Sequence, residues 1–110
     1  MVKCITTECI LYDIDHYGKY SVGVEQNFFQ NIKEDYKIPY KNKILKLNPP
    51  KNNNYTFDEN NLKIEPKKLI NARCDITFNI REYNFENSKG ERLAGYSCSI
   101  VKLVRKHHVS

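Results

Sequence analysis

The 110-residue chain has no tryptophan, only four glycines and four cysteines, and no apolar run longer than a few residues. Because a membrane-spanning helix needs about 20 consecutive apolar residues, none is expected here. The first residues, Met1–Cys4, lead directly into an alternating pattern and not into the apolar stretch of a signal peptide. We therefore expect an intracellular protein, cytoplasmic or nuclear, that does not contact a membrane.

Sequence motifs of catalysis are also missing. The chain contains no G-x-S-x-G, no glycine-rich phosphate loop and no H-E-x-x-H. Its one acid–histidine cluster is Asp13-x-Asp15-His16, and strand alternation turns both of these acids toward solvent. Four glycines and no second layer of helices leave little material for a deep substrate pocket. We expect a protein that is not an enzyme and that needs no metal or cofactor.

The four cysteines are scattered at Cys4, Cys9, Cys74 and Cys98, without a C-x-x-C pair or a histidine at zinc-ligand spacing. Each has apolar or β-branched neighbours, among which cysteine behaves as a small hydrophobic residue. The pattern predicts reduced, buried thiols. A Cys4–Cys9 or Cys74–Cys98 disulfide is the alternative.

The chain does contain long stretches in which apolar and polar residues alternate, the signature of half-buried strands. Alternation predicts strands near 4–14, 20–25, 73–85 and 93–104, with a short one at 44–47. Turns are expected at 16–19 and 87–90, where a glycine can adopt positive φ. Residues 1–110 are thus predicted to form a single mainly β domain, a small five-stranded OB-like barrel or a compact sandwich, with a basic tail at 105–110.

Several finer features follow from the same patterns. Apolar residues four apart predict a short helix over 28–36, and Pro66 is expected to open one helical turn through Ile70. Residues 62–64 could form a further short strand. In the first strand, Ile10, Tyr12 and Ile14 are expected on one side and Leu11 with Asp13 on the other. After Ile80 the apolar positions move by one residue, to Tyr83 and Phe85, which a β-bulge would produce.

Positive charge is concentrated in two parts of the chain. The totals are 18 Lys+Arg against 13 Asp+Glu, a net charge of +5. The stretch from Lys37 to Lys51 has five lysines, no acid and an interleaved tyrosine, and 102–108 is basic as well. Proteins that bind single strands combine a cationic groove for phosphates with aromatic side chains on which bases stack. The alternative is that these lysines only keep the protein in solution and the tyrosines belong to the core.

The segments CDITFNIREYNF (74–85) and GERLAGYSCSIVKL (90–103) resemble the closing hairpin of viral and phage OB-fold single-stranded-DNA-binding proteins. In those proteins an aromatic-rich strand end leads through a short loop and a glycine into the strand that completes the barrel. The resemblance implies a barrel whose open face holds the nucleic acid. By position it implies groove residues at Arg81, Tyr83, Phe85 and Arg92.

These observations predict a non-enzymatic protein that binds single-stranded DNA or RNA without sequence preference, by electrostatics and aromatic stacking. Such a protein would belong to viral replication, and other viral or replication proteins are candidate partners. The alternative is a viral structural or host-factor-binding module, with strand edges and aromatics that contact another protein. The candidate binding residues are Lys37, Tyr40, Lys41, Lys43, Lys46, Arg81, Tyr83, Phe85 and Arg92.

Overall fold

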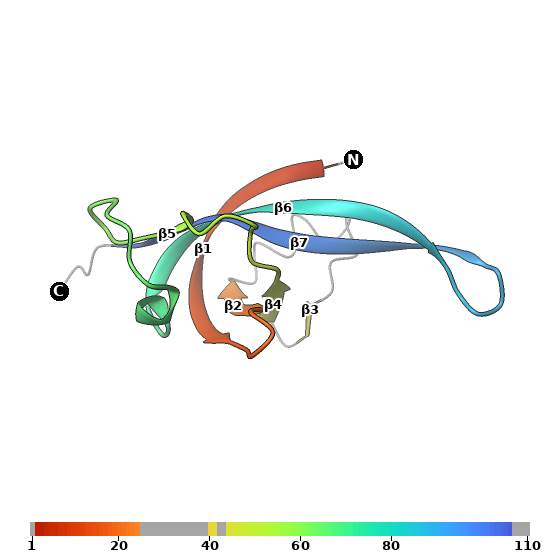
Figure 1. The fold of residues 1–110 in the computed structure, drawn as a ribbon, viewed down its shortest axis with the longest axis horizontal. Helices are drawn as coiled ribbons and strands as arrows, with labels where there is room; N and C mark the ends of the chain where they lie inside the picture. The colour runs from red at the N-terminus through yellow and green to blue at the C-terminus, as the bar shows by residue number, and fades with distance from the viewer. Residues whose placement is uncertain (1, 25–39, 42–43, 107–110) are drawn as a thin grey trace.

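The computed structural model describes residues 2–24, 40–41 and 44–106, which are mostly β-strand (Figure 1). The elements are β1 (Val2–Ile14), β2 (Tyr20–Val24), β3 (Tyr40–Lys41), β4 (Ile44–Leu47), β5 (Thr56–Phe57), the 3-10 helix η1 (Pro66–Leu69), β6 (Arg73–Glu86) and β7 (Arg92–Arg105). This confirms the mainly β prediction, the strands predicted near 4–14, 20–25, 44–47, 73–85 and 93–104, and a helical turn that begins at Pro66. The helix predicted over 28–36 lies outside the described residues. Within the described part of the chain, no helix is long and apolar enough to cross a membrane.

The strands form a sheet in the order β3-β4-β2-β1-β6-β7-β5. Strand β1 has a partner along each edge, because its first part, 2–10, pairs with β6 and its last part, 9–14, pairs with β2. Both ladders are antiparallel. The strand bends strongly between its two partners, so β2 and β4 lie below the long β6–β7 pair (Figure 1).

A further backbone contact joins strands that are far apart in this order. Just after β4, Asn48 forms an isolated parallel bridge with Ser99 of β7. The Asn48 N–H donates to the carbonyl of Cys98 at 2.9 Å, and the Ile100 N–H donates to the carbonyl of Asn48 at 2.9 Å. The sheet therefore curls until the end of β4 meets the middle of β7.

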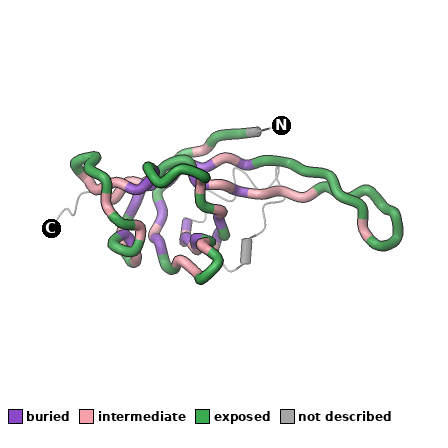
Figure 2. Tube along the Cα trace, in the orientation of Figure 1, coloured by how far each residue is buried: buried purple, intermediate pink, exposed green. Residues whose placement is uncertain are grey.

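The hydrophobic core lies on the inner side of this curl, and buried residues alternate along β2, β4 and the first half of β6 (Figure 2). It includes Leu11, Tyr20, Val22, Leu45, Leu47, Leu69, Ile76, Phe78, Ile80, Ile100 and Leu103. The β6–β7 register shifts between Thr77 and Phe78. Val101 is the extra residue and is exposed, so the apolar positions on both sides of the bulge can face inward.

Two sequence expectations about side-chain direction are wrong. The β6–β7 ladder runs from Phe78 to Glu86 without a shift, so no bulge follows Ile80, and Tyr83 and Phe85 face away from the core row. In β1 the register shifts between Leu11 and Asp13, which makes Tyr12 the extra residue. Leu11 is buried on the same side of β1 as Cys9, and Tyr12 is exposed, the reverse of the expected arrangement. The bulge comes after Leu11, and it lets Ile14 return to the core side.

The strand expected at 62–64 is also reduced, to an isolated bridge between Lys63 and Phe57. The chain turns back just before this bridge. Turns of the same geometry begin at Asp15, Asp58 and Asn87 in the part of the chain that the structure describes. In each, the side-chain oxygen of the first residue accepts N–H groups from the residues two and four positions later, at 2.8–3.0 Å. The fourth residue has positive φ: Gly18, Asn61 or Gly90. Glycine and asparagine tolerate this backbone region best, which explains why the two glycine-containing turns were predictable from sequence.

All four thiols are free. Cys9, Cys74 and Cys98 are buried as expected, but Cys4 is exposed because strand alternation puts it on the opposite side of β1 from Cys9. Burial raises the pKa of Cys74 and of Cys98 to about 11, and it raises that of Cys9 further.

A thiol-modification assay on the folded protein should therefore find rapid reaction at Cys4 alone, because Cys4 is exposed and the other three thiols are buried. The three buried thiols should react only as the protein unfolds, because their thiolates are scarce and shielded. In denaturant without reductant all four should react. Rapid modification of two or more thiols in the folded protein would contradict the burial described here.

Candidate nucleic-acid interface

The distal part of the β6–β7 hairpin projects beyond the core as an arm, which we define as residues 81–97. Pairing between β1 and β6 ends at Val2 and Arg81, and every residue of β6 from Arg81 onward is exposed. The arm extends to one side of the molecule and ends in the Asn87 turn (Figures 1 and 2). The molecule measures 53 Å along its longest axis, the direction in which the arm extends, and 29 and 23 Å along the other two axes.

The arm has two chemically different faces. Strand alternation and the β6–β7 register put Arg81, Tyr83, Phe85, Leu93, Gly95 and Ser97 on one face, called the aromatic face below. The opposite face carries Glu82 and Glu86, with Arg92 paired directly across from Glu86. Of the candidates predicted on this hairpin, three therefore share a face and Arg92 lies on the other.

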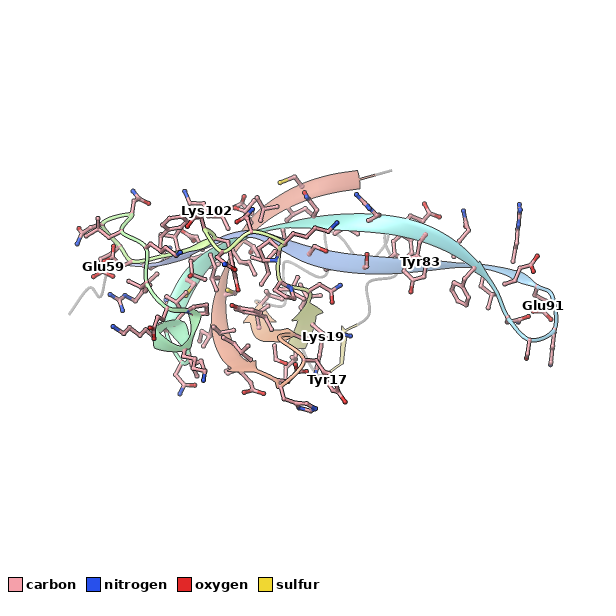
Figure 3. The ribbon with its side chains drawn as sticks, viewed as in Figure 1. Tyr17, Lys19, Glu59, Tyr83, Glu91 and Lys102 are labelled. Carbon is pink, nitrogen blue, oxygen red and sulfur yellow. The ribbon has the colours of Figure 1, made fainter. Side chains whose placement is uncertain are left out.

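The aromatic face exposes large apolar side chains in a row. The ring centroids of Tyr83 and Phe85 are 5.8 Å apart, with the rings tilted by 35°. Tyr83, Phe85 and Leu93 remain 47%, 43% and 39% exposed. Tyr83 also lies against Gly95, where an added Cβ would clash with the far end of the tyrosine ring (Figure 3). A contiguous exposed apolar row of this kind is typical of a binding surface.

The lysine-rich stretch contributes a second part of the candidate interface. Lys46 is exposed between buried Leu45 and Leu47, and it pairs with Ser21 on the outer side of the sheet. Strand β3, which consists of Tyr40 and Lys41, pairs with β4 and forms one edge of the sheet. The predicted residues Lys37 and Lys43 lie outside the described residues.

The turn between β1 and β2 exposes an aromatic residue that the sequence reasoning assigned only to a turn. Tyr17 is 77% exposed, and its ring centroid lies 3.9 Å from that of His16. Asp15 holds this turn by accepting N–H groups from Tyr17 and Lys19 at 2.9 Å. The backbone N–H of Lys19 is the main reason that the pKa of Asp15 lies below its usual value. The signal available in the sequence was an aromatic residue directly before the turn glycine.

The basic C-terminal stretch is in part neutralised by ion pairs. Arg105 is the last residue of β7 and no part of a tail, and its Nε donates to Glu59 Oε2 at 2.6 Å. Lys106 contacts the carboxylates of Glu8 and Asp75. The hydrogen bond with Glu59 raises the pKa of Arg105. These two cations therefore act mainly in holding the end of β7 in place.

The described residues contain no cluster of three or more His, Cys, Asp or Glu side chains that could hold a metal ion. A pocket of about 410 Å³ lies beside β5, and its lining includes Tyr55, Lys63 and Glu65 but neither histidine nor cysteine. No family model, curated protein or solved structure matches this chain. The fold defines a protein with a strongly curled, mainly β sheet.

The arm should depend on Asn87, because its side chain accepts the N–H groups of Lys89 and Glu91 at 2.9 and 3.0 Å. Asn87→Ala should remove both hydrogen bonds, each worth about 1 kcal/mol, and speed amide hydrogen exchange in 81–97. The core strands should keep their protection, because the arm shares little buried surface with them. Ser88→Ala, in the same loop, is the matched control and should leave exchange unchanged. Faster exchange in β2 and β4 of the Asn87 variant would show that the arm is not independent of the core.

Proposed function

We propose that this chain is an OB-like barrel that binds single-stranded nucleic acid without sequence preference. The strand order supports this fold. Strands β1, β2 and β4 are antiparallel neighbours in the sheet, with only the two-residue strand β3 between β2 and β4 among the described residues, and β6 returns beside β1. The resulting order, β6-β1-β2-β4, is that of a Greek key.

The fifth strand supports closure. Strand β7 pairs with β6 along its length and meets β4 through the Asn48–Ser99 bridge. In the proposed barrel the five strands would follow one another in the order β1-β2-β4-β7-β6, and the Asn48–Ser99 bridge would join β4 to β7. An OB-fold is a five-stranded, partly open Greek-key barrel. Pairing of β4 with β7 through one bridge is consistent with a barrel that is partly open between these two strands.

The distribution of exposed aromatics is the observation that carries the function. OB-folds bind oligonucleotides on the face of their second and third strands and on the loops that follow their first and fourth strands. In this chain those elements are β2 with β4, the Asp15–Lys19 turn, and the arm. They carry Lys46, Tyr17, and the pair Tyr83 and Phe85, all exposed.

The charges suggest a division of roles between the two parts of the interface. The arm from Arg81 to Arg92 has three basic and three acidic residues, so it offers little net attraction for phosphates. Its aromatic face would instead stack on bases, which is worth about 1–3 kcal/mol per base and tolerates any sequence. The lysines near the β3–β4 edge would attract the phosphates. A duplex hides its base faces, so single strands are preferred.

A labelled single-stranded oligonucleotide should therefore bind more tightly than a duplex of the same sequence in fluorescence anisotropy. If Lys37, Lys41, Lys43 and Lys46 each neutralise one phosphate, log K against log salt should have a slope of roughly −3, at about 0.7 per phosphate on single strands. Equal affinity for duplex would indicate generic attraction to a polyanion. No binding to either would favour the alternative, in which the exposed arm contacts a protein partner.

Single substitutions should separate the two roles. Lys46→Ala should flatten the salt slope by about 0.7, whereas Tyr83→Ala should weaken binding about 5- to 160-fold with the slope unchanged, since stacking releases no counterions. Lys67→Ala in η1 and Leu62→Ala, both exposed and away from the proposed face, are the matched controls. If Lys67→Ala changes the salt slope as much as Lys46→Ala does, the proposal that the lysines near the β3–β4 edge bind the phosphates is wrong.

A further inference from the structure

Tyr12 and Tyr83 share an arrangement that recurs in two distant parts of the sheet. Each ring lies against a glycine on the neighbouring strand: Tyr12 against Gly23 of β2, and Tyr83 against Gly95 of β7. A Cβ added at Gly23 would clash with Cε2 of Tyr12 and lie 2.9 Å from its Cζ. A Cβ added at Gly95 would clash with Cζ of Tyr83 and lie 2.6 Å from its hydroxyl oxygen. Any other residue at either glycine would have to displace the ring.

These contacts fix how the rings lie. Cζ and the hydroxyl oxygen form the far end of a tyrosine side chain, so their closeness to the adjacent strand means that the ring lies across the sheet. A ring that projected away from the sheet would carry these atoms far from the glycine. The two side chains are 48% and 47% exposed, as expected when one side of a ring rests on the strand and the other is open to solvent.

The two rings lie in the two parts of the candidate interface, one beside β4 and one on the arm. Gly23 pairs with Ile44 of β4, two residues before the exposed Lys46, so Tyr12 covers the outer side of the β1–β2 ladder beside the lysine-bearing strand. Tyr83 is the corresponding ring on the arm, next to Phe85. Glycine weakens a strand interior and often marks a site of close approach. Both glycines are explained if an ordered, exposed ring is needed over them.

We propose that Tyr12 and Tyr83 are two preformed stacking platforms for unpaired bases, one on the barrel surface and one on the arm. The proposal rests on the proposed function and adds to it a binding residue, Tyr12, and two positioning residues, Gly23 and Gly95. A ring already held flat loses little conformational freedom when a base stacks on it, so more of the stacking energy appears as affinity. The single strand then crosses from the β1–β2 surface to the aromatic face of the arm.

The absence of tryptophan from the chain allows a direct test. Tyr12→Trp and Tyr83→Trp each introduce a unique fluorophore that a stacked base quenches. Titration with an oligothymidylate of about 16 nucleotides, the upper site size of an OB-fold, should quench both indoles, with midpoints that match anisotropy binding curves. Leu62→Trp, in the turn at the opposite end of the molecule from the arm, should not be quenched.

A second test moves the ring without removing it. Gly23→Ala should displace Tyr12 and weaken binding by up to the loss expected for Tyr12→Ala, about 5- to 160-fold. In the Tyr12→Ala background the same glycine substitution should have no further effect, because no ring remains to be displaced. Thermal unfolding of each variant shows whether the fold is retained.

The outcomes distinguish a failure of the proposed function from a failure of the proposed stacking platforms. If the unaltered protein fails to bind the oligonucleotide, both the proposed function and the proposed stacking platforms are wrong. If the protein binds but the indole of the Tyr12→Trp variant is not quenched, the platform at Tyr12 is wrong while the function stands. An equal loss from Gly23→Ala with and without Tyr12 would likewise overturn the positioning role of the glycine.

Discussion

The backbone hydrogen bonds between Asn48 and β7 are the constraint on which the rest of the molecule depends. They join the end of β4 to a strand several places away in the sheet, which requires β1 to bend between its two partners. Once the sheet curls, the inward residues of all the longer strands enclose a single core. A chain of this size buries only about two-thirds of its unfolded surface, so it can supply one such core and no more. In the proposed function, the binding surface is the outer side of the same strands.

The arm has few of the contacts that stabilise the core. A two-stranded ribbon is only marginally stable by itself, and this one is anchored by the buried half of the same strands, from Cys74 to Ile80. The Asn87 turn fixes its tip, and cross-strand contacts such as Tyr83 on Gly95 fix its surface. Local opening of such an element costs far less than global unfolding. The arm can therefore open locally without loss of the core.

The net charge of the chain is a poor measure of its attraction for a polyanion. Arg105 and Lys106 at the end of β7 are engaged with Glu59, Glu8 and Asp75 and contribute to holding the end of that strand. Lys102 lies over the ring of Phe57, 5.5 Å from its centroid. For the proposed binding, what matters is which cations remain exposed on strands that also carry aromatic rings. Lys46 is exposed, two residues along β4 from Ile44, the partner of the glycine on which Tyr12 lies.

Local sequence patterns were enough to predict the mainly β character, the four long or well-patterned strands and the two glycine turns, because alternation and turn chemistry are local properties. They also picked out Lys46, Tyr83 and Phe85 as candidates, since runs of basic and aromatic residues can be read directly from the chain. The outward direction of Tyr12, the separation of Arg92 from Tyr83 and the contact between β4 and β7 came from the folded structure alone. A strand has a side-chain period of two, so a bulge of one residue reverses the faces of all that follow. Where such a shift occurs depends on pairing partners distant in the chain, and no local pattern contains that information.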